Sequence, residues 1–236
     1  MNHNPRADPS IWSLGWHVMR RQGEAIRALL AHRDLQLRDL RVLDFGCGSR
    51  PYESWFKAAG ASYAGADIDA RHEVKIREDG ALEAADGSYG MVASFQVLEH
   101  VWDTARYLGE AHRVLRSEGW LLLSTHGSWF YHPHPGDYRR WTAEGLRREV
   151  ESNGFELVAL EPVVGPLAWT SILRSYGVAF ACRRLPLVGA ALEALATLFY
   201  NVRSAIEDRI TPREVTANNA CVYVGLYRRL PEAGKR

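Results

Sequence analysis

Two short stretches of this 236-residue sequence hold the residue types best suited to chemistry. The first, Arg41 to Tyr52, reads RVLDFGCGSRPY, in which an apolar run leads to Asp44 and then to Gly46 and Gly48. This order is typical of a strand, a tight turn and the start of a helix. Such a junction points backbone N–H groups and the positive end of a helix dipole at a ligand, and glycine allows close approach. We therefore expect a ligand to bind at this turn.

The second stretch, residues 125–142, reads THGSWFYHPHPGDYRRWT and follows a predicted strand directly. Histidine is the side chain best suited to act as a base near neutral pH. We take His126 and His134 as candidate general bases, and His100 as a third whose competing role is packing at a helix start. A stiff loop whose histidines hydrogen-bond locally is the alternative that the residues leave open.

The same loop offers His132, His134 and Asp137 as potential metal ligands. Adjacent prolines and the lack of further clustered Cys or His side chains argue against this, because zinc sites normally need three or four ligands. The three cysteines lie far apart, without metal-ligand spacing, at Cys47, Cys182 and Cys221. We predict no metal and no disulfide framework, which fits a reducing cytoplasm.

The elements that must position these residues alternate between strands and helices. Strands are predicted around 42–43 and at 62–66, 74–76, 91–95, 120–124, 155–164 and 220–227, with helices at 52–60, 103–117 and 142–153. This alternation predicts an α/β fold with a mostly parallel sheet between helices, whose ligands lie at the carboxyl ends of the strands.

An acidic residue, Asp67, ends the second predicted strand about 20 residues beyond the glycine turn. Doubly wound sheets place a carboxylate for ribose hydroxyls at that distance. Asp69 is the second candidate, and a solvated loop aspartate is the competing interpretation. Spacing alone does not decide between them.

Four motifs in order resemble the class I S-adenosylmethionine-dependent methyltransferases. They are DFGCG at 44–48, GADID at 65–69, DGxL at 79–82 and VLEHV at 97–101, and the segment RVLRSEGWLLL at 113–123 is also similar. The resemblance covers about residues 40–165 and, more weakly, the last strand. It implies a Rossmann-like sheet of seven mostly parallel strands, with the last strand antiparallel and helices on both faces. A nicotinamide dehydrogenase would normally carry GxGxxG at the turn, whereas Asp44 precedes GCG here and Ser49-Arg50-Pro51 follows.

The resemblance also implies roles for individual residues toward S-adenosylmethionine. Asp44, Gly46 and Gly48 would surround its methionine part, Asp67 would bind the ribose, and Ile68 would lie against the adenine. Asp79 would meet the adenine amino group. The full predicted cofactor set is Asp44, Gly46, Cys47, Gly48, Asp67, Ile68, Asp79, Gly80, Phe95 and Gln96. Arg50 stands where relatives often have a third glycine, and Gly90 replaces an aspartate often found before the fourth strand.

Composition excludes several classes of protein. The formal net charge is +1 and arginine pairs are scattered, so no concentrated basic block predicts nucleic-acid binding. Residues 1–10 are polar, without the apolar core of a secretory signal, and we expect a cytoplasmic protein. With 47% hydrophobic residues, the chain can form one large domain spanning residues 1–236.

Two helical segments flank the predicted sheet. Residues 1–35 are expected to form an N-terminal helical cover that contains an amphipathic helix between Trp12 and Arg33. We expect this helix to pack on the core, and the alternative is a lid over the ligand turn. Residues 165–216 form an apolar insertion before the last strand. Its best window for a membrane span is interrupted by Pro186, Gly189, Glu193 and Arg203. We expect the insertion to cap the substrate pocket; dimer packing and peripheral contact with a membrane surface are the alternatives.

These features predict methyl transfer to an oxygen of a small molecule such as a sugar or natural-product intermediate. The histidine-rich loop favours oxygen, because a hydroxyl nucleophile benefits from a base. The alternatives are a nicotinamide-binding oxidoreductase and a partner subunit that binds the cofactor without catalysis. The predicted substrate contacts are Trp16, Tyr131, His132, Tyr138 and Trp169.

Overall fold

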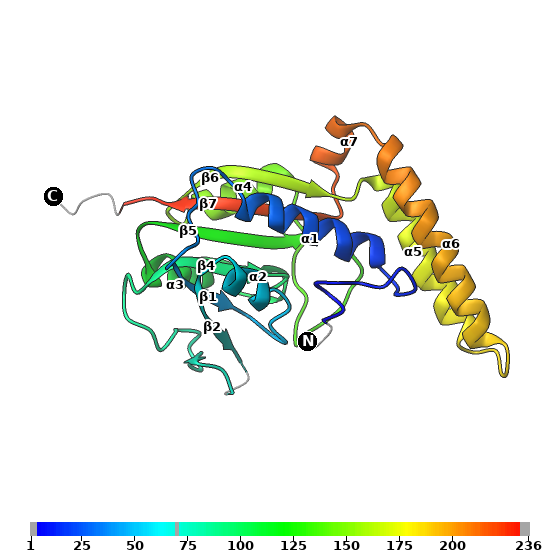
Figure 1. The fold of residues 1–236 in the computed structure, drawn as a ribbon, viewed down its shortest axis with the longest axis horizontal. Coiled ribbons are helices and arrows are strands. Elements are labelled where there is room, and N and C mark those ends of the chain that lie inside the picture. The colour runs from blue at the N-terminus through cyan, green and yellow to red at the C-terminus, as the bar shows by residue number, and fades with distance from the viewer. Residues whose placement is uncertain (1–3, 69–70, 232–236) are drawn as a thin grey trace.

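A seven-stranded sheet organises the computed structural model, which describes residues 4–68 and 71–231 (Figure 1). The strand order is β3-β2-β1-β4-β5-β7-β6, and β7 runs antiparallel to both of its neighbours. The strands are β1 (Arg41–Phe45), β2 (Ser62–Asp67), β3 (Val74–Lys75), β4 (Tyr89–Phe95), β5 (Leu115–His126), β6 (Phe155–Val163) and β7 (Val222–Arg229). This arrangement confirms the predicted Rossmann-like fold with an antiparallel last strand.

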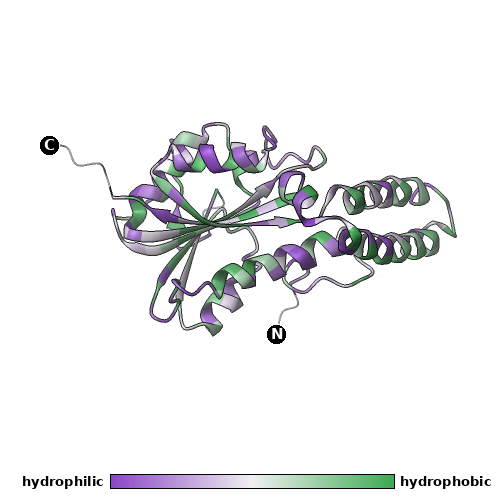
Figure 2. Cartoon of the chain, turned by 90° about the horizontal axis from the view of Figure 1, so that it is seen from above, coloured by the Kyte–Doolittle hydropathy of each residue, from purple (hydrophilic) through white to green (hydrophobic). Residues whose placement is uncertain are grey.

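Helices cover both faces of the sheet (Figure 2). They are α1 (Trp16–Leu30), α2 (Glu53–Ala58), the 3-10 helix η1 (Leu98–His100), α3 (Thr104–Val114), α4 (Ala143–Glu151), α5 (Pro166–Cys182), α6 (Gly189–Ile210) and α7 (Arg213–Asn218). None of the helices in the described ranges has both the length and the hydropathy that spanning a bilayer requires.

Alternating strand residues divide the core into two layers, as the two-residue period of a strand requires. Leu121 and Leu123 of β5 pack in the layer that holds α3 and α4, whereas Leu122 packs in the layer that holds α1 and α2. Helix α1 contributes Val18 and Ile26 to the second layer, so it covers the core as predicted. The N-terminal segment also reaches the ligand side, where Arg6 lines a cavity described below.

Helix α3 is shorter than predicted, and β5 begins earlier. Asp103 caps the helix by accepting a hydrogen bond from the Arg106 N–H at 3.0 Å. The helix ends at Val114 because Leu115 adopts an extended backbone and pairs with Tyr89 of β4. The predicted helix end at Ser117 was therefore wrong: Leu115 continues the apolar helical pattern but is fully buried as a strand residue.

The insertion folds as an antiparallel pair of helices, α5 and α6, that projects from the sheet domain (Figures 1 and 2). None of the described residues from 165 to 216 lines the main cavity. The predicted cap over the substrate pocket is therefore not seen in this structure, because the hairpin points away from the domain. We call α5, α6 and the turn between them the α5–α6 hairpin.

Candidate active site

A cavity of about 960 Å³ lies at the carboxyl ends of β1, β2 and β4, where this architecture places ligands. Seven residues of the predicted cofactor set line it: Gly46, Gly48, Asp67, Ile68, Asp79, Gly80 and Gln96. Three of the predicted histidines line it as well: His100, His132 and His134. The glycine turn and the histidine-rich loop therefore share one cavity.

The glycine turn is held by β2 and shaped by two left-handed residues. The N–H groups of Gly46 and Cys47 donate to the Ala66 carbonyl at 2.7 and 3.1 Å. Gly46 has φ +85°, and a Cβ atom there would lie 2.4 Å from a methyl group of Val97. Gly48 has φ +48°, and a Cβ atom there would meet no protein atom within 4 Å. The turn therefore leaves open space beside Gly48, on the cavity side.

Asp67 joins this turn to the end of β2. Its carboxylate accepts hydrogen bonds from the Gly48 N–H and the Ile68 N–H, both at 2.8 Å. Ile68 is 76% exposed although it lines a cavity, so a flat apolar ligand surface could cover it. Asp79, at the far side, accepts from the Ala81 N–H at 3.1 Å and lies 3.1 Å from Arg106. Asp69 lies outside the described residues.

Three members of the predicted cofactor set lie behind the cavity wall: Asp44, Cys47 and Phe95. Burial raises the pKa of Asp44 to about 7, although the Tyr63 hydroxyl donates to its carboxylate at 2.5 Å. The second carboxylate oxygen of Asp44 has no hydrogen-bond partner among the described residues. Burial also raises the pKa of Cys47 to about 12, so the thiol is not a nucleophile near neutral pH. Asp44 therefore contacts Tyr63 of β2 and does not line the cavity.

Replacing Asp44 with asparagine should flatten the pH dependence of stability. A carboxyl whose pKa rises from 3.8 to about 7 on folding stabilises the fold when protonated, and this contribution is lost as pH rises through that window. We expect the wild-type free energy of unfolding to fall by about 2 kcal/mol relative to Asp44→Asn between about pH 5 and pH 7. Urea unfolding at both pH values measures this. The exposed Asp34→Asn is the control, and parallel pH profiles for wild type and Asp44→Asn would contradict the assignment.

Arg50, at the position of the frequent third glycine, points away from the cavity. Its guanidinium donates to Glu73 at 2.8 and 2.5 Å, and Glu73 also accepts from the Gly65 N–H at 2.9 Å. This contact lowers the pKa of Glu73 to about 2. Arg50 has φ +56°, so it adopts the left-handed backbone that a glycine would adopt easily. The arginine therefore secures the turn to β2 and its following loop without entering the ligand space.

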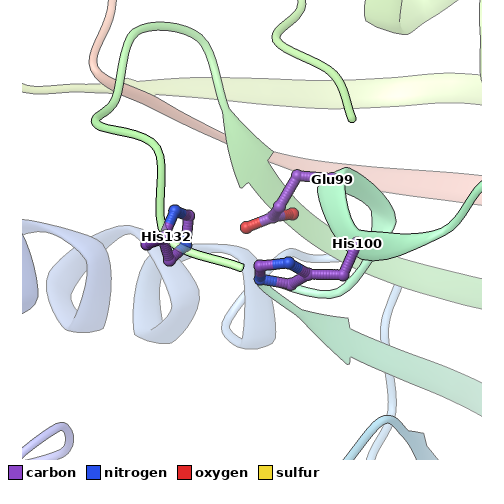
Figure 3. A group of neighbouring side chains, drawn as sticks. All are labelled: Glu99, His100 and His132. Carbon is purple, nitrogen blue, oxygen red and sulfur yellow. The ribbon is translucent and has the colours of Figure 1, made fainter. Parts of the chain in front are cut away.

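His100 is oriented by a contact with the histidine-rich loop. Its Nδ1 lies 2.6 Å from the Gly136 carbonyl oxygen. Because a carbonyl oxygen only accepts, Nδ1 carries the proton, and in the neutral ring Nε2 then has a free lone pair. Figure 3 shows His100 next to His132 and Glu99. Among the candidate bases, His100 and the exposed His134 line the cavity.

His126, the remaining candidate base, is buried at the end of β5 and is only 4% exposed. Its Nδ1 lies 2.7 Å from Glu99 Oε1, and the Thr125 hydroxyl donates to Glu99 Oε2 at 2.8 Å. Burial lowers the pKa of His126, and Trp129 stacks on its ring at a centroid distance of 4.9 Å. His126 therefore acts as a partner for the fully buried Glu99 and has no access to the cavity.

A metal site was not predicted, yet Glu99, His100 and His132 bring ligand atoms within 4.8 Å of one another (Figure 3). Glu99 Oε2 accepts from the Thr125 hydroxyl, whereas Glu99 Oε1 lies 2.7 Å from His126 Nδ1 without a hydrogen bond between them. His100 Nδ1 is directed at a carbonyl, and His132 Nδ1 lies 3.1 Å from the Phe130 carbonyl. These contacts account for Glu99 Oε2 and for Nδ1 of both histidines, while Glu99 Oε1 has no hydrogen-bond partner among the described residues.

The predicted substrate contacts fall in separate places. His132 lines the main cavity, whereas Tyr131 and Tyr138 line a neighbouring hollow of about 270 Å³. Trp169 stacks on Trp129 with centroids 4.9 Å apart, and Trp16 lies at the start of α1. Only His132 is therefore brought to the main cavity.

The loop that carries these aromatic residues is tied down by Asp137 and Arg140. Arg140 donates to the Asp137 carboxylate at 2.6 and 2.7 Å and to the Phe130 carbonyl at 2.5 Å. The guanidinium holds the pKa of Asp137 well below its usual range. Asp137 and Arg140 therefore hold the two ends of this loop segment together.

Several lining residues were not predicted from the sequence: Arg6, Phe45, Ile76, Glu78, Val97, Val101, Trp102, Asp103, Arg106, Tyr107, Pro133 and Pro135. Trp102 is 72% exposed, and its place directly after the VLEHV motif was the sequence signal that could have indicated it. Arg6 gave no such signal, because it reaches the cavity from a polar N-terminal segment that is distant in sequence.

Comparisons with a family model and with individual proteins agree on one family for this chain. A family model described as a methyltransferase domain matches residues 16–160. A probable S-adenosylmethionine-dependent methyltransferase of Mycolicibacterium smegmatis is 33% identical over 154 residues, which cover 58% of this chain and 59% of that protein. A ubiquinone biosynthesis O-methyltransferase of Parvibaculum lavamentivorans is 25% identical over 142 residues, covering 54% of this chain and 48% of that protein. The matches thus span about half the length of these two relatives.

The fold also matches solved structures. A structure described as an S-adenosylmethionine-dependent methyltransferase from Mesorhizobium loti superposes with a TM-score of 0.55 and 16% sequence identity. The match covers 89% of this chain and 98% of that one. At this identity the likeness concerns the fold alone.

Proposed function

This chain belongs to the class I S-adenosylmethionine-dependent methyltransferases, and we propose that it transfers a methyl group to an oxygen atom of a small molecule. A sugar or a natural-product intermediate is the acceptor class that we favour. One observation carries the proposal: a single cavity holds the glycine turn with Asp67 and also His100, whose Nε2 has no hydrogen-bond partner among the described residues. The relative described as an O-methyltransferase supports the choice of oxygen.

The residues present fit S-adenosylmethionine. The open space beside Gly48 admits a ligand close to the backbone, and the exposed Ile68 offers an apolar surface to a purine ring. Asp67, held in place by two backbone N–H groups, presents a carboxylate for ribose hydroxyls. When bound, S-adenosylmethionine supplies an electrophilic sulfonium methyl group. A volume of about 960 Å³ is near the top of the range for small-molecule pockets, which leaves room for an acceptor.

His100 is the base that we assign to the acceptor hydroxyl. Its Nδ1 donates to the Gly136 carbonyl, which fixes both the ring orientation and the tautomer with Nε2 unprotonated. Displacement at a methyl group depends mainly on alignment of the nucleophile, so a base that accepts the hydroxyl proton at Nε2 also helps to position the oxygen. His134, exposed at the same cavity, is the second candidate.

A screen of acceptors with methyl-labelled S-adenosylmethionine tests the reaction. Matched panels of hydroxyl, amine and activated carbon compounds should give label in an O-methyl product from the hydroxyl panel. Mass spectrometry identifies the methylated atom. Transfer only to amines or to carbon would contradict the assignment to oxygen. Binding of S-adenosylhomocysteine without transfer to any panel would favour the alternative of a non-catalytic subunit.

A further inference from the structure

Helix α6 carries its apolar side chains outward and its small or polar side chains inward. The exposed positions, spaced three and four residues apart, are Leu192, Leu195, Phe199, Val202, Ile206 and Ile210. The buried positions are Gly189, Thr197, Asn201, Ser204 and Glu207. In water an amphipathic helix buries its apolar stripe. Helix α6 shows the reverse distribution, and Figure 2 shows the α5–α6 hairpin as a largely hydrophobic projection.

Helix α5 follows the same inverted pattern over most of its length. It buries Ala168, Ser171, Ser175 and Ala179, together with Ile172, which packs on the domain core. Leu173 and Phe180 are exposed. Helices that pack against each other in lipid place small residues between them and apolar residues outside. The α5–α6 hairpin therefore has the packing expected for a lipid environment.

The base of the α5–α6 hairpin is anchored to the domain by polar contacts, whereas its far end carries exposed apolar side chains. Asn201 donates to the Ile11 and Ser13 carbonyls at 2.6 and 2.9 Å, and Asp208 lies 3.0 Å from His17. At the turn, Leu187 is fully exposed, with a relative exposure of 104%. The anchoring contacts thus fix the direction in which the apolar end projects.

Few charges lie in the far part of the hairpin. Between positions 175 and 202 the charged residues are Arg183, Arg184 and Glu193. Arg183 pairs with Glu193 at 2.6 Å, and the exposed Arg184 gives the turn a net positive charge. This charge complements the anionic surface of a membrane.

We propose that the α5–α6 hairpin inserts its far end into one leaflet of an anionic membrane. Both helices and the turn expose apolar side chains, and lipid can cover all of these surfaces, whereas a second copy of the chain would cover one face. From Gly189 to Val202 helix α6 rises ~20 Å, more than the ~15 Å of hydrocarbon in one leaflet, so the hairpin enters obliquely and keeps Arg184 at the level of the headgroups.

Membrane insertion would also orient the cavity. Helix α5 follows β6. Val222 of β7 pairs both with Val163 at the end of β6 and with His126 at the end of β5, so β5 and β6 end at the same edge of the sheet. The α5–α6 hairpin therefore leaves from the carboxyl edge of the sheet, the edge that carries the cavity. Insertion would hold that edge toward the lipid.

Cosedimentation of the full chain with vesicles tests the proposal. The vesicles contain phosphatidylcholine with or without phosphatidylglycerol. We expect the wild-type protein to pellet with the anionic vesicles. A double variant that combines Leu187→Asp and Phe199→Asp should reduce the bound fraction by about tenfold or more. Leu230→Asp, an exposed apolar position outside the α5–α6 hairpin, is the matched control and should bind like wild type. Circular dichroism and calorimetry with S-adenosylhomocysteine check that both variants keep the fold and the cofactor site.

Several results would overturn the proposal. The proposal is wrong if the wild-type protein stays in the supernatant with anionic vesicles, or if the double variant pellets as well as wild type. It is also wrong if Leu230→Asp loses vesicle binding to the same extent as the double variant. A wild-type dimer in light scattering that the double variant dissociates, without vesicle binding, would assign the hairpin to a second copy instead. Because cofactor binding is measured separately, failure of membrane binding leaves the proposed methyl transfer untouched.

Discussion

Replacing Gly48 with valine should weaken the binding of S-adenosylhomocysteine by at least about a hundredfold, which corresponds to ~2.7 kcal/mol. The reason is steric: a Cβ atom at Gly48 meets no protein atom within 4 Å and therefore enters the space that we assign to the ligand. Calorimetric titration of wild type and variant measures the change. An unchanged dissociation constant would show that the ligand lies elsewhere.

The control for this substitution is Gly109→Val on helix α3. A Cβ atom at Gly109 also meets no protein atom within 4 Å, but Gly109 does not line the cavity. This variant should bind S-adenosylhomocysteine like wild type. Gly48 has φ +48°, so valine there also introduces backbone strain of about 1 to 3 kcal/mol. Thermal unfolding of both variants separates this loss of stability from the loss of ligand space.

Replacing His100 with alanine should lower kcat by about a hundredfold or more, the usual contribution of a general base. Binding of S-adenosylhomocysteine should change little, because His100 is assigned to the acceptor. His100→Gln keeps a donor for the Gly136 carbonyl but supplies no base, so it should be as slow as His100→Ala. Turnover of the acceptor found in the screen, measured across pH, tests both variants.

The pH profile distinguishes a base from a structural role. A base must be unprotonated, so wild-type turnover should fall in acid, and both His100 variants should lose this acidic limb. His32→Ala, which removes a histidine outside the cavity, is the control. Recovery of wild-type rates by His100→Gln would show that the hydrogen bond to Gly136, rather than proton transfer, is what matters. Loss of rate only in His134→Ala would move the assignment to His134.

Much of the cavity wall could be predicted from the sequence because its signals are local. The glycine turn and Asp67 each lie at the end of a short apolar strand, and parallel strands bring those ends to one edge. Asp44, Cys47 and Phe95 were placed in the same set because they are adjacent to lining residues. Strand alternation instead turns Asp44 and Phe95 into the domain, and Cys47 is buried in the turn after β1. The presence of a residue in a motif does not reveal which way its side chain points.

The histidines show what local signals leave out. The predicted strand stopped at Ser124, but pairing of His126 with Val222 extends β5 and buries the His126 ring. His100 is oriented by the carbonyl of Gly136, a contact between segments 36 residues apart that no periodicity records. Sequence analysis therefore identified the candidate bases, while long-range pairing decided which of them reach the cavity.

The α5–α6 hairpin was predicted as helical, and none of its residues lines the main cavity that it was expected to cap. Its apolar spacing predicts an amphipathic helix, and the usual inference turns the apolar stripe toward the protein. The structure instead turns Thr197 and Ser204 inward and leaves Phe199 exposed. Periodicity defines a face, but it does not identify the medium that the face contacts.

Calorimetry of the wild-type chain with S-adenosylhomocysteine and, separately, with NAD tests the central assignment most directly. The cavity formed by Gly48, Asp67 and Ile68 predicts saturable binding of S-adenosylhomocysteine and no measurable heat with NAD. Tight binding of NAD with no response to S-adenosylhomocysteine would contradict the account.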